Sequence, residues 1–269
     1  MSTQQDTFIS HLVELRDRLL RSILAIALVF IVLFVYPGSG PIYDFLAAPL
    51  MRALPEGAKM IATGVITPFV VPVKITAVTA LLIALPYVLY QAWAFVAPGL
   101  YTHEKRLVLP LVIASTVLFL LGVAFCYYFV FGKVFTFINS FAPQSITPAP
   151  DIEAYFGFVL TMFLAFGVTF EIPVVVVVLA RVGIVSLEQL RQARPYVIVG
   201  AFVVAAIVTP PDVISQILLA VPMWLLYELG IFVARFVIKP AGASDWKAPG
   251  DAEMAHELDK ADADRQDLK

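Results

Sequence analysis

Long uninterrupted apolar runs constrain this chain more than any other feature of its sequence. Four of them, at residues 22–37, 73–95, 107–131 and 154–180, are close to or above the roughly 20 residues that a helix needs to cross a bilayer. Hydrophobic residues make up 61% of the chain and charged residues only 14%. Soluble domains are closer to half apolar and a quarter charged. The sequence therefore predicts an all-α integral membrane protein.

Two further apolar runs follow, at residues 195–208 and 213–234. The first is short enough to be a buried or re-entrant segment instead of a span. Arg194 marks one of its ends, and Pro210 and Pro211 enforce a turn at the other. We therefore expect a short spanning helix followed by a second one that is also rather short. Together with the first four runs, this predicts a polytopic bundle of six transmembrane helices.

The distribution of positive charge predicts the orientation of these spans. Six spans place both termini on one side of the membrane, and Lys and Arg collect in cytoplasmic loops. With a cytoplasmic N-terminus, inner segments hold 14 of the 18 Lys and Arg residues. The other four lie in outer segments: Arg52, Lys59, Lys74 and Lys133. Both termini are therefore expected in the cytoplasm.

The segments outside the spans have distinct patterns. Residues 1–21 carry Phe8, Leu12, Leu15 and Leu19 on one helical face, which predicts an amphipathic helix at the cytoplasmic interface. The first outer segment, 38–72, has enough apolar residues for a short interfacial helix: Ile42, Phe45, Leu46 and Leu50. Residues 22–238 form the transmembrane domain, and the acidic tail 239–269 has the composition of a disordered segment.

Two acidic residues near the predicted cytoplasmic face have two interpretations each. Glu14 is spaced to form an i, i+4 ion pair with Arg18, or it faces a ligand. Glu104 lies near the end of the loop FVAPGLYTHEKR, residues 95–106, where it caps the next helix or binds a cationic partner. Two carboxylates on neighbouring elements would suit two guanidinium groups, since arginine binds carboxylate in a bidentate manner.

A third acid, Glu171, lies inside the fourth span. About 17 residues separate it from the outer end of its helix, which places it on the order of 26 Å deep. A carboxyl at this depth is costly unless it is protonated, paired or hydrated, so it is a candidate functional residue. Pro173 follows and is expected to kink the helix. The pair predicts a polar concavity in the bundle.

The last apolar run carries a polar stripe after its Pro-Pro-Asp turn. Asp212, Gln216, Met223 and Tyr227 share one helical face. Asp212 is also well placed to cap the helix. An amide exposed to lipid is unfavourable, and side-chain hydrogen bonds join membrane helices. Gln216 therefore suggests a face on which a partner helix docks.

Enzymatic functions find little support in the sequence. It contains no HExxH motif, no pair of intramembrane aspartates, no spacing typical of metal ligands and no glycine-rich phosphate loop. The lone Cys126 lies in an apolar run and is expected to be inert. We expect no catalytic residues, metal or other cofactor, and the net charge of −2 does not indicate a nucleic-acid partner.

Five segments in this order resemble the TatC family, the multi-spanning subunits of the twin-arginine protein translocase. They are HLVELRDRL (11–19), YQAWAFVAPGLYTHEKR (90–106), FGVTFEIP (166–173), RPYVIVGAF (194–202) and TPPDVISQILLAVPMWLLYE (209–228). The similarity covers residues 8–238. It implies a signal-peptide receptor in the bacterial cytoplasmic membrane that exports folded proteins with the proton-motive force.

The resemblance also implies roles for individual residues. Glu14 and Glu104 would contact the paired arginines of the signal peptide. Four residues would shape that site: Arg16, Phe95, Pro98 and Leu100. Glu171 and Pro173 would line a groove in a concave bundle. The single-span subunits TatA and TatB would dock on the fifth and sixth helices near Asp212, Gln216, Met223 and Tyr227, within a complex holding several copies of the chain.

The residues alone are also compatible with a second function, proton-coupled transport of a small solute. Glu171 could serve as the protonated carboxyl of a proton-coupled small-solute transporter. Such transporters gather polar groups near the membrane midplane. The two other acids, Glu14 and Glu104, lie instead at the predicted cytoplasmic surface, which favours a peptide-binding surface.

Overall fold

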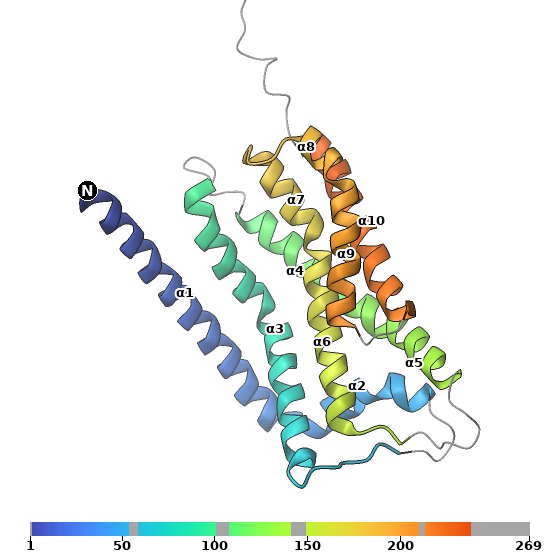
Figure 1. The fold of residues 1–269 in the computed structure, drawn as a ribbon. Coiled ribbons are helices and arrows are strands. Elements are labelled where there is room, and N and C mark those ends of the chain that lie inside the picture. Colours follow the sequence, from blue (N-terminus) through green and yellow to red (C-terminus); the bar gives the residue numbers. More distant parts are fainter. Residues whose placement is uncertain (1, 54–58, 101–107, 141–148, 210–212, 238–269) are drawn as a thin grey trace, which may run out of the picture.

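The described part of the chain is almost entirely helical. The computed structural model describes residues 2–53, 59–100, 108–140, 149–209 and 213–237. In chain order, the elements in Figure 1 are α1 (Ser2–Val35), α2 (Ser39–Ala53), α3 (Thr67–Leu100), α4 (Val108–Phe125), the π-helix η2 (Cys126–Val130), α5 (Phe131–Ser140), α6 (Ile152–Phe170), α7 (Ile172–Arg181), α8 (Leu187–Gln192), α9 (Arg194–Val208) and α10 (Val213–Val237). This confirms the predicted all-α class.

Within the described residues, five helical stretches are long and apolar enough to cross a membrane. They are Ser10–Val35, Thr67–Phe95, Val108–Ile138, Ile152–Arg181 and Val213–Val237. The run expected at 195–208 forms α9, whose 15 residues rise only about 22 Å. The six apolar runs of the sequence thus each correspond to helix, and the fifth is short.

Two helix boundaries differ from the predicted ones. Pro68 and Pro72 predict that the second span begins at residue 73, yet α3 begins at Thr67. Pro68 falls in the first turn, where the missing N–H would have had no helical acceptor. The sequence also predicts a rather short last helix that ends at residue 234. The helix extends to Val237 and, at 25 residues, can span the hydrocarbon core.

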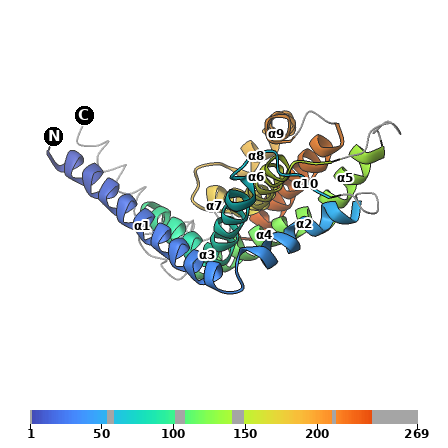
Figure 2. The ribbon, with the colours of Figure 1, turned by 90° about the horizontal axis from the view of Figure 1, so that it is seen from below.

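Helix α1 stands at one edge of the molecule and packs mainly along α3 (Figures 1 and 2). It continues through position 21 without a break, so the amphipathic segment and the first span form one helix. Most of its apolar side chains are exposed, including Leu24, Leu28 and Val35. Such a surface is suited to contact with lipid.

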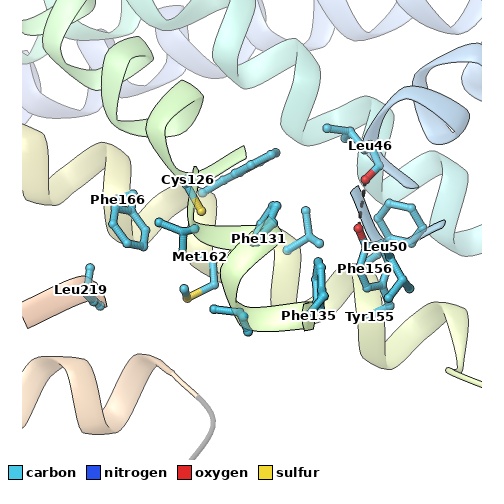
Figure 3. Packing of buried hydrophobic residues seen from close by; sticks show 14 of the residues in the cluster. Leu46, Leu50, Cys126, Phe131, Phe135, Tyr155, Phe156, Met162, Phe166 and Leu219 are labelled. Atoms are coloured by element: carbon cyan, nitrogen blue, oxygen red, sulfur yellow. Dashed lines mark hydrogen bonds between the residues drawn. The ribbon is translucent and has the colours of Figure 1, made fainter. Parts of the chain in front are cut away.

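The main core lies where η2, α5 and α6 meet α2 and α10. Aromatic side chains dominate it, and Phe131 and Phe163 have ring centroids 5.5 Å apart. Figure 3 shows Phe131, Met162 and Phe166 along this interior, with Leu219 approaching from α10. Cys126 is fully buried here and has no disulfide partner. It therefore fills space, as the sequence suggests.

Two glycines bring α4 and α6 close together. A Cβ atom on Gly122 would lie 2.6 Å from the backbone oxygen of Phe166, and one on Gly167 would overlap the ring of Phe119. Small residues permit such close backbone approach in membrane proteins, where helix association relies on van der Waals packing. The α4–α6 contact therefore requires glycine at position 122.

Helix α2 forms as expected in the segment predicted to lie on the outer side, residues 38–72, but it is part of the core. Leu46 and Leu50 are buried, whereas Phe45 is exposed. Pro49 has no N–H to donate to the carbonyl of Phe45, four residues earlier. The hydroxyl of Tyr127 donates to that carbonyl instead, at 2.6 Å. The tyrosine thus replaces the missing helical hydrogen bond and ties α2 to η2.

A second tyrosine holds the other side of α2. The hydroxyl of Tyr155, at the start of α6, donates to the carbonyl of Leu46 at 3.1 Å, as Figure 3 shows. Nearby, Asp151 caps α6 by accepting from the amides of Glu153 and Ala154. It also accepts from the amide and hydroxyl of Thr63, which joins the segment before α3 to the start of α6. These hydrogen bonds, led by the one from the Thr63 hydroxyl, lower the pKa of Asp151.

Candidate functional site

The polar face of α1 meets the last turns of α3. The ring of His11 stacks on that of Phe95, with centroids 4.3 Å apart and planes 16° from parallel. Further along α1, Arg18 reaches across and its Nη1 donates to Oε1 of Gln91 at 3.3 Å. Two contacts thus align α1 with the end of α3 around Glu14 and Phe95, two of the residues predicted to bind a peptide.

Glu14 lies between these two contacts. Its Oε1 accepts from Nε and Nη2 of Arg18 at 2.9 and 2.6 Å, which confirms the predicted i, i+4 ion pair. Its Oε2 lies 4.0 Å from Nδ1 of His11, at the outer limit of an ion pair. Both guanidinium nitrogens use the same oxygen, so the carboxylate keeps acceptor capacity on the other. The side chain is partly exposed, so this oxygen can receive a further donor.

The structure describes some of the other residues predicted for this site and leaves others out. Arg16 is exposed and pairs with its neighbour Asp17 at 2.9 Å. Pro98 and Leu100 belong to the last turn of α3, and their side chains lie outside the described part of the chain. Glu104 also lies outside the described residues. The proximity of Glu14 and Glu104 therefore stays a prediction.

Gln91 is a residue of this region to which sequence reasoning assigns no role. It is 4% exposed and accepts the hydrogen bond from Arg18. A signal for it is present, because an amide inside a long apolar run needs a hydrogen-bonding partner. The same argument selects Gln216 in the last helix. Applied to residues 73–95, it would select Gln91.

Glu171 lies at the break between α6 and α7. Helix α6 ends at Phe170 and α7 starts at Ile172, with Pro173 in its first turn. The expected interruption beside Pro173 is thus present. Oε1 of Glu171 is buried and has no hydrogen-bond partner among the residues that the structure describes.

The polar stripe of the last helix divides into residues with different surroundings. Nε2 of Gln216 donates to the carbonyl of Phe202 in α9 at 3.1 Å, so it already joins α9 to α10. Met223 helps line a cavity of about 440 Å³ between α6, α9 and α10. Tyr227 is buried and its hydroxyl donates to the carbonyl of Leu190 at 2.7 Å. Asp212 lies outside the described residues.

An ion pair joins the start of α9 to α10, next to Tyr227. Nη2 of Arg194, the first residue of α9, donates to Oε2 of Glu228 at 2.7 Å. The two side chains are only partly exposed, which strengthens the interaction relative to a pair at the open surface. Together with Gln216, this pair fixes how α9 lies against α10.

Comparison with known proteins agrees with this arrangement. Residues 10–222 match the family model for the Sec-independent protein translocase protein TatC. Proteins of that name from Haemophilus influenzae and Escherichia coli K12 are similar at 52% and 49% identity over 233 and 230 residues. These alignments cover 87% and 86% of this chain, and 90% and 88% of the relatives.

A solved structure is also similar to this one. The crystal structure described as the twin-arginine translocase receptor TatC matches with a TM-score of 0.74 and 38% sequence identity. The match covers 85% of this chain and all of the other. Family, relatives and fold agree, and the apolar helices are those of a membrane protein. This chain belongs to the TatC family of Sec-independent protein translocase components.

Proposed function

We propose that this chain is the subunit of a twin-arginine translocase that binds the paired arginines of signal peptides. The observation that carries the proposal is the geometry of Glu14. Its carboxylate already accepts two hydrogen bonds from a guanidinium, that of Arg18, through one oxygen alone. A second guanidinium can therefore approach the other oxygen. Phe95 stacks on His11 beside this carboxylate, at the end of α3 that leads toward Glu104.

The membrane orientation follows from the same proposal. Both termini would lie in the cytoplasm, with the Glu14 face at the cytoplasmic surface of the bacterial inner membrane. Helix α2 and the hydrogen bonds around Asp151 would then lie on the outer side. The excess of Lys and Arg in the inner segments supports this orientation.

A binding experiment tests the Glu14 site. Labelled signal peptides with either two arginines or two lysines are titrated against the protein in lipid nanodiscs, and Kd is measured by fluorescence anisotropy. We expect Glu14→Gln to weaken the arginine peptide by about tenfold, because a charge-assisted hydrogen bond contributes about 1.5–3 kcal/mol. The lysine peptide should respond less, since an ammonium cannot bind a carboxylate through a planar fork.

Asp17→Asn is the matched control for this experiment. It removes one negative charge from the same helix, but Asp17 is exposed and paired with Arg16. Its affinity for the arginine peptide should stay within about twofold of the unaltered protein. Equal losses in the two variants would indicate a general charge effect and contradict a specific site. Glu104→Gln, tested in the same assay, should resemble Glu14→Gln.

We further propose that α9 and α10 dock the single-span subunits TatA and TatB through a face that includes Gln216 and Met223. The polar stripe and the cavity beside Met223 support this assignment. Gln216→Leu should reduce site-specific crosslinking to these subunits while peptide affinity is retained. In this proposal Tyr227 does not contact the partner, because it is buried and its hydroxyl donates to the carbonyl of Leu190. Tyr227→Phe is therefore the control, since it also removes a hydrogen bond of α10. Loss of peptide binding with intact crosslinking in Gln216→Leu would reverse the assignment.

A further inference from the structure

Arg18 lies between two hydrogen-bond acceptors that come from different helices. Its Nε and Nη2 donate to Oε1 of Glu14, in α1, at 2.9 and 2.6 Å. Its Nη1, on the other side of the guanidinium, donates to Oε1 of Gln91, in α3, at 3.3 Å. One arginine is therefore held from two sides, by a carboxylate of its own helix and by an amide of the neighbouring one.

The ion pair between Arg18 and Glu14 differs from the usual fork of arginine and carboxylate. In that fork, two parallel N–H groups each meet a different oxygen. Here both N–H groups meet the same oxygen. Oε2 of Glu14 lies 4.0 Å from Nδ1 of His11, which is beyond hydrogen-bonding distance. The pairing thus leaves available an oxygen that a complete fork from Arg18 would occupy.

The burial of Gln91 explains why it can restrain the guanidinium. Its side chain is 4% exposed, in the part of α3 that α1 packs along (Figure 1). Water therefore competes little for the amide oxygen, and a buried acceptor that loses its donor is costly. The side chain of Arg18 is itself only 22% exposed, so it has limited room to turn toward solvent. Gln91 and Arg18 therefore restrict each other's orientation.

We infer that Gln91 is a positioning residue that keeps Arg18 on one oxygen of Glu14 and so leaves the other oxygen for an arginine of the signal peptide, an inference that rests on the proposed function of Glu14. The contact between Gln91 and Arg18 is already long, so a turn of the guanidinium toward the second oxygen would break it. Without the amide, Arg18 closes on Glu14 as a fork and competes with the arriving guanidinium. Gln91 acts through Arg18 and does not touch the peptide.

Peptide binding in two backgrounds tests this role, with the arginine peptide and the full chain in nanodiscs. Gln91→Met has nearly the same size and removes the acceptor. We expect it to raise Kd about fivefold, since the peptide must then displace a hydrogen bond of Arg18. In an Arg18→Lys background it should change Kd by less than about twofold, because an ammonium cannot form the planar fork. Equal losses in both backgrounds, or no loss in either, would overturn the inference.

Thr76→Val is the matched control. Thr76 is also buried in α3, and its hydroxyl donates to the carbonyl of Pro72 within the same helix. The substitution should change Kd by less than about twofold, because this hydrogen bond does not involve Arg18. A loss as large as that of Gln91→Met would mean that any buried polar group of α3 has this effect, which contradicts a positioning role. If Gln91→Met does not fold, Gln91→Asn takes its place, since its amide is one methylene shorter.

A measurement without peptide tests the contact itself. The Nη1 resonance of Arg18 is followed by solid-state NMR of the ¹⁵N-arginine-labelled protein and is identified by its loss in Arg18→Lys. It should shift in Gln91→Met and stay in place in Thr76→Val; an unchanged resonance in Gln91→Met would refute the inference. Glu14→Gln separates the two proposals. If it leaves Kd unchanged, the proposed function fails and the role of Gln91 with it. If it weakens binding and Gln91→Met does not, only the role of Gln91 fails.

Discussion

Replacing Gly122 by alanine should separate α4 from α6. The added Cβ would lie 2.6 Å from the carbonyl oxygen of Phe166 and 2.8 Å from Cγ of Phe170, one turn further along α6. The first of these atoms belongs to the backbone, so a side-chain rotation cannot remove the clash. Inserting one methyl group into such packing typically costs about 1–3 kcal/mol. Alanine is also the better helix former by about 1 kcal/mol, which offsets part of that loss.

Reversible unfolding in mixed micelles measures the result. We expect Gly122→Ala to lower the free energy of unfolding by up to about 2 kcal/mol once the helix propensity is included. Gly157→Ala, also in α6, is the control, because a Cβ atom at position 157 would have no atom within 4 Å. That variant should be unchanged or more stable by up to about 1 kcal/mol. Equal stability of the two variants would contradict the idea that Gly122 is needed for close packing of α4 against α6.

Three further predictions have definite expected outcomes. Glu228→Gln should lower the free energy of unfolding by about 1–2 kcal/mol in the same assay, because it leaves the Arg194 guanidinium partly buried without its anion. The pairing is verified if the double variant Glu228→Gln/Arg194→Gln loses less stability than the two single variants lose together. Tyr227→Phe should cost about 1 kcal/mol through the hydrogen bond to Leu190; no change would contradict a structural role. Hydrogen bonds lower the pKa of Asp151, so the stability it contributes is present above its unfolded pKa, about 4, and is lost as the pH falls through the folded pKa. Hydrogen-exchange protection at the start of α6 should therefore decline below about pH 4, and Asp151→Asn should abolish this pH dependence.

The long helices could be predicted because length and hydropathy suffice to identify them. Their boundaries were less accessible, since a proline such as Pro68 is compatible with both a loop and a first helical turn. Helix α2 is expected from its apolar residues, but its place in the core depends on Tyr127 and Tyr155. Those hydroxyls come from distant segments, and no local pattern predicts which carbonyl they reach.

The candidate site was predictable where partners are close in sequence. The Glu14–Arg18 pair follows from helical spacing alone. Its link to Gln91 does not, because it depends on which face of α3 meets α1. Periodicity likewise places Gln216 and Tyr227 on one stripe. It cannot show that α9 meets the first side chain and that the carbonyl of Leu190 accepts from the second.

Pro49 removes one hydrogen bond from α2 and leaves a carbonyl to which another helix binds. An ordinary residue at this position would donate its N–H to the Phe45 carbonyl and leave the Tyr127 hydroxyl to share an occupied acceptor. With proline, the carbonyl has no helical donor, and the Tyr127 hydroxyl supplies one from within the protein when α2 is docked. Docking of α2 against η2 therefore also completes a hydrogen bond that Pro49 removes from within the helix. One substitution in the sequence of α2 thus couples its internal hydrogen bonding to its place in the fold.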